Sequence, residues 1–140
     1  VKVYSNPEAS GQKTNKFKKI TSMNNHYPCP SCGFQVFNEP PGSYDICPIC
    51  FWEDDLSQLR FLKMKGANKV SLIEAQINFR NMGAIEERLL RHVRKSDAED
   101  KKDELWRPID LSLDEIEESI PGKDYGLTYP EDTTQLYYWK

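Results

Sequence analysis

Two cysteine pairs constrain this chain more than any other feature of its sequence, and they contain all four of its cysteines. Cys29 and Cys32 form one C-x2-C motif, and Cys47 and Cys50 form the other. A C-x2-C turn can direct both of its sulfurs at one ion, and two such turns supply the four thiolates that close a tetrahedron around zinc. The pattern therefore predicts a single Zn²⁺ ion bound by all four cysteines.

The residues around the cysteines favour a zinc ribbon, which is a β-hairpin that carries two metal-binding turns. A proline follows the first cysteine of each pair and fixes one dihedral of the turn, while Gly33 permits the positive φ at which the first turn closes. Residues 34–37 are short, apolar and β-prone, residues 40–43 read Pro-Pro-Gly-Ser, and residues 44–46 suit a returning strand. We expect the two turns to be built alike.

Four thiolates leave no coordination position open for water, so the predicted zinc is structural. Two disulfides are the main alternative, but cysteines two residues apart make a poor structural disulfide, and nothing else indicates a secreted protein. A redox-active C-x2-C site is less favoured, because it needs one reactive pair beside a βαβ unit. His26 could replace a cysteine as a ligand, although four thiols already complete the set.

Three stretches of the sequence resemble the bacterial cysteine-rich CPCC family. They read YPCPSCGF, PPGSYDICPICFWEDD and GANKVSLIEAQINFRNMGAIEERLLRHVRK, and the likeness extends from residue 27 to residue 95. Where the family has two adjacent cysteines this chain has Ser31 and Cys32, which suggests that the additional family cysteine is not a ligand. The resemblance implies a small zinc-binding domain of poorly defined activity, similar to immunity or antitoxin proteins encoded beside bacterial toxins.

The length suits one small domain, and the predicted ribbon and helices make it an α+β fold. A chain of 140 residues can bury a modest core, which a metal can supplement. There is no apolar run of membrane-spanning length and no signal peptide, so we expect a cytoplasmic protein. No nucleophile is accompanied by an activating histidine, and no glycine-rich phosphate loop is present, so we expect no enzymatic activity.

Two helices are predicted after the cysteines. Ser71 and Glu74 form a capping box ahead of an apolar stripe that ends at Gly83. A second helix is expected over residues 85–93. It carries the one basic cluster on an element predicted to be ordered: Arg88, Arg91, Arg94 and Lys95. We interpret this cluster as a surface paired with neighbouring glutamates, and a nucleic-acid contact as the alternative.

Charge divides the chain into three parts. Residues 1–22 hold five lysines and one glutamate, and we interpret them as a disordered basic arm or a segment added to the native chain. Residues 23–95 form the zinc-ribbon and helical domain. Residues 96–140 hold thirteen acidic and five basic residues and form an acidic extension. In this extension we expect a short helix over residues 113–119, and a strand or docking tail over residues 135–140.

We expect the protein to be a non-catalytic interaction module, and specifically an immunity or antitoxin protein that neutralises a toxin domain. Acidic side chains could fill the basic cleft of a toxin that acts on nucleic acid, and terminal aromatic residues could add contacts. The predicted partner-binding residues are Glu53, Asp54, Asp55, Glu115, Glu117, Glu118, Tyr137, Tyr138 and Trp139. The alternative function is a nucleic-acid-binding zinc ribbon. No membrane contact is expected, and the sequence leaves the oligomeric state open.

Overall fold

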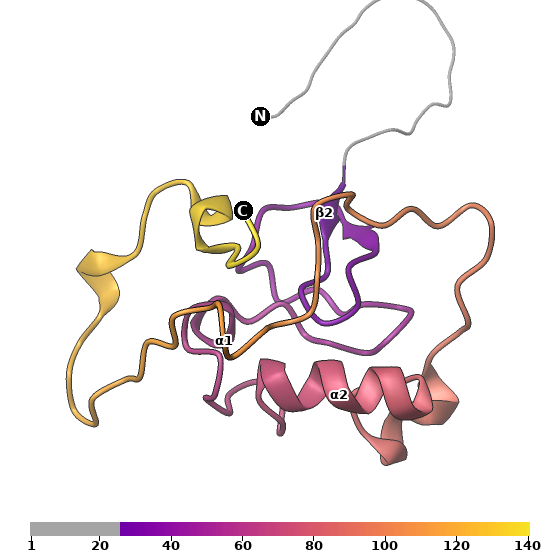
Figure 1. The fold of residues 1–140 in the computed structure, drawn as a ribbon, viewed down its shortest axis with the longest axis horizontal. Coiled ribbons are helices and arrows are strands. Elements are labelled where there is room, and N and C mark those ends of the chain that lie inside the picture. The colour runs from indigo at the N-terminus through magenta and orange to yellow at the C-terminus, as the bar shows by residue number, and fades with distance from the viewer. Residues whose placement is uncertain (1–25) are drawn as a thin grey trace, which may run out of the picture.

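The computed structural model describes residues 26–140, so the predicted basic arm at residues 1–22 lies outside the described residues. The described part is a small α+β fold in which a two-stranded sheet stands above the long helix (Figure 1). Its elements in chain order are β2 (Tyr27–Pro28), β3 (Gln35–Phe37), α1 (Leu56–Arg60), α2 (Leu72–Met82), and the 3-10 helices η1 (Glu87–His92), η2 (Gly126–Thr128) and η3 (Thr133–Leu136).

The strand pairing differs from the predicted ribbon. β3 pairs antiparallel with β2, which precedes the first cysteine pair, and Tyr27 lies opposite Phe37. The predicted partner, residues 44–46, turns away because Tyr44 adopts a positive φ of 62° and Ile46 forms a bridge with Glu53. Each cysteine pair therefore closes a small hairpin of its own. The prediction of one hairpin between the two pairs was wrong.

Helix α1 begins at a buried acidic residue. The Asp55 carboxylate accepts hydrogen bonds from the backbone N–H groups of Ser57 and Gln58, which leaves the first turn of the helix with a capped end. Its second oxygen accepts the N–H of Ala67, from the loop that leads to α2. Asp55 thus fixes both the start of α1 and the path of the following loop.

Helix α2 follows the sequence prediction at both ends. The Ser71 side chain accepts the Glu74 N–H, and the Glu74 side chain accepts the Ser71 N–H, so the capping box is complete. Gly83 ends the helix in the left-handed conformation with φ of 94°. Leu72, Ala75 and Gln76 form the buried face of the helix.

Two of the other predicted elements take different forms. Residues 87–92 form the 3-10 helix η1 in place of an α-helix over residues 85–93. Residues 113–119 contain no helix, because their side chains bond elsewhere: Asp114 pairs with Arg107 and Glu117 pairs with Arg60. A helix there would also place several carboxylates side by side, and repulsion between them opposes it.

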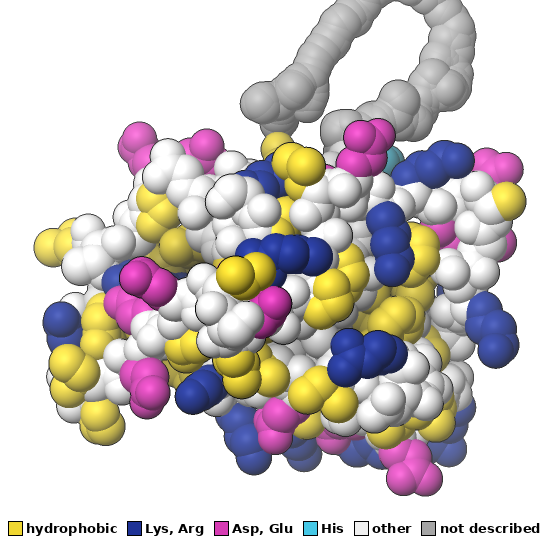
Figure 2. Space-filling view, in the orientation of Figure 1, with side chains coloured by type: hydrophobic (Ala, Val, Ile, Leu, Met, Phe, Trp, Pro, Cys, Tyr) yellow, Lys and Arg dark blue, Asp and Glu magenta, His cyan; other side chains and the backbone are white. Residues whose placement is uncertain are grey.

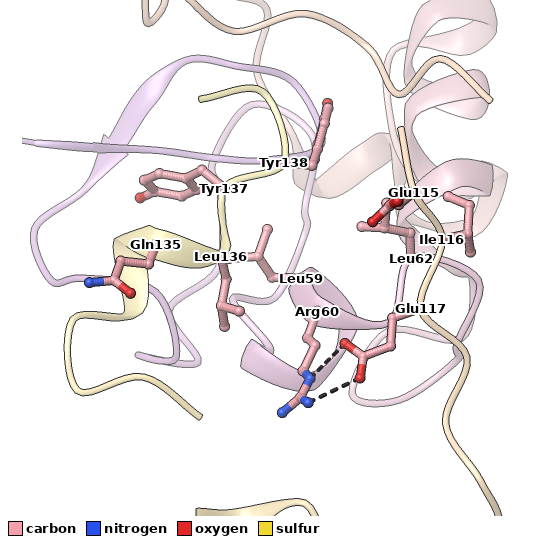
Figure 3. A pocket seen from close by; sticks show the side chains of 10 residues that line it. All are labelled: Leu59, Arg60, Leu62, Glu115, Ile116, Glu117, Gln135, Leu136, Tyr137 and Tyr138. Atoms are coloured by element: carbon pink, nitrogen blue, oxygen red, sulfur yellow. Dashed lines mark hydrogen bonds and ion pairs between the residues drawn. The ribbon is translucent and has the colours of Figure 1, made fainter. Parts of the chain in front are cut away.

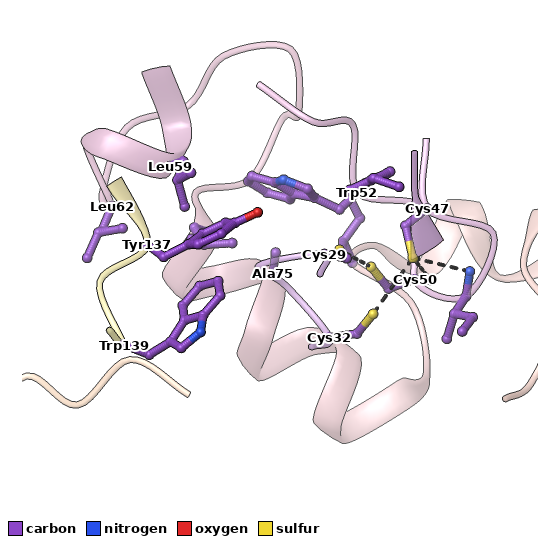
Figure 4. Packing of buried hydrophobic residues seen from close by; sticks show 14 of the residues in the cluster. Cys29, Cys32, Cys47, Cys50, Trp52, Leu59, Leu62, Ala75, Tyr137 and Trp139 are labelled. Carbon is purple, nitrogen blue, oxygen red and sulfur yellow. Dashed lines mark hydrogen bonds between the residues drawn. The ribbon is translucent and has the colours of Figure 1, made fainter. Parts of the chain in front are cut away.

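The acidic extension packs against the cysteine-containing domain. Residues 101–103 run beside β3, where Gln35 N–H donates to the carbonyl of Lys101 and Phe34 forms a bridge with Lys102. At the C-terminus the chain forms η3 and a turn, and the strand predicted as one of two alternatives is absent from residues 135–140. The chain ends as a docking tail in which Tyr137 and Trp139 are buried. Their rings join a core that also contains Trp52, Leu59 and the cysteines (Figure 4).

Candidate metal centre

The four cysteines meet at one buried point between the two hairpins. Cys29 and Cys32 lie in the turn between β2 and β3, which we call knuckle 1, comprising residues 29–34. Cys47 and Cys50 lie in knuckle 2, comprising residues 47–52, whose ends are joined by the bridge between Ile46 and Glu53. All four side chains are at most 1% exposed, and their sulfurs gather beside Trp52 (Figure 4).

Distances between the sulfurs fit a single tetrahedral ion. The Cys29 and Cys50 Sγ atoms are 3.6 Å apart, those of Cys32 and Cys47 are 3.7 Å apart, and all four lie within 4.8 Å of one another. Zinc binds thiolate sulfur at about 2.3 Å, so the corners of a regular tetrahedron around it lie about 3.8 Å apart. Bonded disulfide sulfurs lie about 2.0 Å apart, and here all four cysteines are free.

The two knuckles share one backbone design. Cys29 N–H donates to the carbonyl of Phe34, and at the equivalent position Cys47 N–H donates to the carbonyl of Trp52, both at 2.8 Å. In each knuckle the residue after the second cysteine donates its N–H to the carbonyl of the first cysteine. That residue adopts a positive φ, which is 84° at Gly33 and 75° at Phe51. The prediction that the two turns are built alike is confirmed.

Electrostatics at this point favour a bound cation. Burial raises the pKa of the Cys29 thiol and that of the Cys50 thiol well above the ordinary value of a cysteine. At Cys47 burial also opposes ionisation, but hydrogen bonds from the neighbouring thiols and from the backbone N–H of Cys50 outweigh it and lower the pKa. Because buried like charges repel, four thiolates can coexist here only with positive charge among them, which a divalent metal ion supplies.

Backbone N–H groups also point at sulfur. The Cys47 Sγ atom accepts hydrogen bonds from Ile49 N–H at 3.4 Å and from Cys50 N–H at 3.5 Å. Such bonds stabilise a thiolate and hold the ligand in place. The four sulfurs fill every position of a tetrahedral ion, and His26, which is exposed, is not part of the group. The site therefore suits a structural metal rather than a catalytic one.

Two residues that sequence reasoning missed support knuckle 1 from outside. The carbonyl of Pro30 accepts hydrogen bonds from Gln76 Nε2 at 2.8 Å and from Trp106 Nε1 at 3.0 Å. Gln76 Nε2 also donates to the Tyr138 hydroxyl, and Gln76 Oε1 accepts the Ile109 N–H. The one sequence signal was that Gln76 follows Leu72 by one helical turn, which places a polar residue on the apolar stripe of α2.

The acidic triplet after the cysteines is largely structural. Asp54 is 2% exposed and accepts hydrogen bonds from the Gly42 N–H, the Ser43 N–H and the Ser43 hydroxyl. Asp55 is buried as the cap of α1, and Glu53 is half-buried. The sequence predicts a partner-binding surface at all three. Asp54 and Asp55 instead hold loops together, because their carboxylate oxygens face backbone donors inside the protein.

The remaining predicted partner residues divide into two groups. Glu115, Glu117 and Glu118 are exposed, and Glu117 forms a two-bond ion pair with Arg60 beside a pocket between α1 and the extension (Figure 3). Tyr137 and Trp139 are buried, with their rings stacked at 4.5 Å between centroids. Tyr138 is half-buried and its hydroxyl donates to the carbonyl of Arg107. The aromatic terminus therefore contributes to this protein's own core.

The basic cluster on η1 and beyond is partly neutralised. Arg88 pairs with Glu86, and Arg94 pairs with Asp100 through two hydrogen bonds. Arg91 and Lys95 are exposed and form no ion pair with any residue in 26–140.

Comparison with known proteins identifies the family. None of the helices in residues 26–140 is long and apolar enough to span a membrane. A search of curated proteins gave no match. The family described as cysteine-rich CPCC matches residues 27–100, which hold both knuckles, α1, α2 and η1. Because this match covers more than half of the 140 residues, the chain belongs to the cysteine-rich CPCC family.

Proposed function

We propose that the four cysteines bind one structural zinc ion, and that the zinc-stabilised domain is a non-catalytic interaction module of the immunity or antitoxin type. The observation that carries this proposal is an exposed acidic and apolar segment held against the domain. This segment, residues 110–120, has five acidic and no basic residues. We call it the acidic segment.

Zinc fits the donor set better than other common divalent ions. Soft thiolate ligands select zinc, copper(I) or iron–sulfur clusters over magnesium and calcium, and a compact S4 tetrahedron is typical of zinc. When bound, the ion supplies folding free energy, which is about 10 to 16 kcal/mol for structural zinc in zinc-finger peptides. The cysteines thereby allow a small domain to hold long irregular loops, and these loops carry the binding surface.

The acidic segment is anchored at a few points and is exposed between them. Asp114 pairs with Arg107 at 2.6 Å, Glu117 pairs with Arg60 at 2.9 Å, and Ile116 packs against the core. Just before these anchors in the chain, Leu111 and Leu113 are 62% and 71% exposed. Apolar and acidic side chains share the side of the molecule where the segment runs, which is the left of the view in Figure 2.

Such a surface suits a basic partner with an apolar floor. Exposed leucines beside carboxylates gain burial and charge pairing together when a cationic cleft closes over them. Enzymes that act on nucleic acid have clefts of this kind, so a toxin domain of that class is the partner we propose. Asp54 and Asp55 take no part in this contact because they are buried.

The test begins with the partner that co-purifies with the zinc-loaded chain from its native host. The double variant Glu115→Lys with Glu118→Lys should lose most of its affinity for that partner and its protection of cells that express the partner. Both side chains are exposed and form no ion pair within residues 26–140, so the fold should remain intact. Glu99→Lys is the matched control, because Glu99 is exposed outside the segment. Equal protection by all three proteins would contradict the proposal.

A nucleic-acid-binding function remains the second candidate, supported by the exposed side chains of Arg91 and Lys95. It predicts affinity for generic DNA or RNA that falls steeply with salt. The ion pairs of Arg88 and Arg94 reduce the positive charge available for such binding, which makes it the weaker of the two.

A further inference from the structure

An apolar groove lies at the C-terminal end of α2, on the side of knuckle 2. Its volume is about 420 Å³, and its apolar walls come from Ile49, Phe79, Met82, Leu90 and Val93. Met82 is 39% exposed and Leu90 is 40% exposed, so large apolar side chains face solvent there. Ile49 is buried beneath them, and Met82 and Leu90 keep this exposed area within residues 26–140.

The charged residues that line the groove are both basic. Arg94 and Lys95 lie along it, and Ser96 follows them. Arg94 is held by Asp100, whereas Lys95 forms no ion pair with any residue in the described part of the chain. A complementary occupant would present apolar side chains next to carboxylates. Residues 1–22, with five lysines and one glutamate, have the wrong charge for it.

The acidic segment has the matching chemistry. It presents Leu111, Leu113 and Ile120, which are 59% to 71% exposed, among the carboxylates of Asp110, Glu115 and Glu118. It cannot reach the groove of its own molecule in this fold. The segment runs beside α1, near the start of α2, whereas η1 and the groove lie at the far end of α2 (Figure 1).

We propose that the acidic segment of a second copy of this chain occupies the groove. The two surfaces differ and lie at opposite ends of the molecule, so the contact is head-to-tail. A contact of this kind leaves one free groove and one free segment at the ends of each assembly, so assemblies grow as open chains unless the rotation between copies closes them into a ring. Self-association would cover the segment assigned above to a partner, and partner binding would then compete with it. The self-association itself does not depend on that partner.

The contact combines apolar burial with charge attraction across a solvated rim. Raising the salt concentration should therefore weaken it without abolishing it, because screening acts on the ion pairs and leaves the leucine contacts in place. Concentrated zinc-loaded full-length chain should sediment as a mixture of sizes that shifts toward monomer on dilution.

Two single substitutions divide the interface into its halves. Leu90→Asp places a negative charge in the groove and leaves the segment intact, whereas Leu113→Lys disables the segment and leaves the groove intact. Both side chains are at least 40% exposed, so neither change opens the core. Each variant alone should be monomeric in sedimentation velocity. An equimolar mixture should form a dimer that grows no further, because it contains one working groove and one working segment.

Leu105→Lys is the matched control, since Leu105 is 65% exposed and lies in neither surface. This variant should associate like the unchanged chain. The proposal is overturned by a wild-type chain that stays monomeric at all concentrations. It is also overturned by a mixture of the two variants that stays monomeric, or by a dimer that both variants retain, which would place the contact on another face. A monomeric chain whose groove binds a different protein would assign the groove to that protein instead.

Discussion

The two knuckles have the same backbone and different surroundings. Each holds two cysteines around a proline, forms the same pair of hydrogen bonds and closes with a positive φ. The Pro30 carbonyl of knuckle 1 is bound by side chains from α2 and the extension, and Pro30 is buried. The equivalent carbonyl of Pro48 accepts the backbone N–H of Arg94, and Pro48 is exposed.

The residues that close the turns reflect these surroundings. A Cβ atom at Gly33 would lie 2.6 Å from the Trp106 ring. The extension can therefore pack this closely on knuckle 1 only because residue 33 has no side chain. At the same turn position in knuckle 2, Phe51 keeps its side chain, and its ring lies 5.6 Å from that of His92. The convergence of the four sulfurs therefore requires the turn, while the neighbouring segment determines which residue closes it.

The largest expected effect treats both knuckles alike. Cys29→Ser and Cys47→Ser should each abolish stable metal binding and cooperative folding, because each removes one thiolate from the proposed zinc site. Structural zinc supplies about 10 to 16 kcal/mol of folding free energy in zinc-finger peptides. Elemental analysis and thermal unfolding measure the two effects. Ser31→Ala is the control, since the buried Ser31 hydroxyl has no hydrogen-bond partner within residues 26–140. A folded, metal-free serine variant would show that the metal does not hold the knuckles.

The next largest effect should be specific to knuckle 1, because only this knuckle packs against Trp106 through a glycine. Gly33→Ala should lower the free energy of unfolding by about 2 to 3 kcal/mol, because alanine is strained at positive φ and its Cβ meets Trp106. Trp106→Ala should then lower the free energy of unfolding by less in the Gly33→Ala protein than in the unchanged protein. Urea unfolding of the four proteins gives the coupling. If the two losses of unfolding free energy simply added, the Trp106 ring would not be in contact with residue 33.

Gln76→Leu should act on knuckle 1 alone. The change removes the donor to Pro30 and Tyr138 and leaves the Ile109 N–H without its acceptor, which should cost about 1 to 3 kcal/mol. Hydrogen exchange should quicken at Ile109. It should stay unchanged at Ile85, whose N–H donates to the Cys50 carbonyl in knuckle 2. Equal acceleration at both amides would indicate that the knuckles open as one unit.

The contrast between local and distant contacts also explains which sequence predictions held. The knuckles and α2 follow rules that span a few residues, such as the proline and Gly33 in the first turn and the Ser71 to Glu74 box. The partner of β3 and the missing helix at residues 113–119 depend on contacts far along the chain. For example, Arg60 binds Glu117, 57 positions away.

The acidic triplet shows the same limit within the site. Its composition suggested a charged surface, yet Asp54 faces a turn eleven and twelve residues earlier in the chain. Only the cap at Asp55, which involves the next three residues, had a local signal, because aspartate is a preferred residue before a helix. Burial of the aromatic terminus likewise required the surface of the first domain, which no pattern in residues 135–140 specifies.

The smallest expected effect concerns the connection between the knuckles. Arg94, whose N–H binds knuckle 2, pairs with Asp100, which precedes the residues that run beside knuckle 1. This pair and the backbone N–H of Asp97 lower the pKa of Asp100 to about 2. A lowered pKa in the folded state stabilises the protein above the ordinary pKa of about 3.9, and this contribution is lost as the pH falls toward the folded-state pKa.

Asp100→Asn should therefore lower the free energy of unfolding by less than about 1 kcal/mol at neutral pH, because the Arg94 side chain of this pair is 49% exposed and solvent screens the attraction. The difference in unfolding free energy between the two proteins should stay constant from about pH 8 to about pH 5 and shrink below about pH 4. Urea unfolding in parallel measures this difference down to the lowest pH at which both proteins fold. A difference that instead grows on acidification would mean that Asp100 is protonated more readily in the folded protein, and that the connection between the knuckles does not depend on its charge.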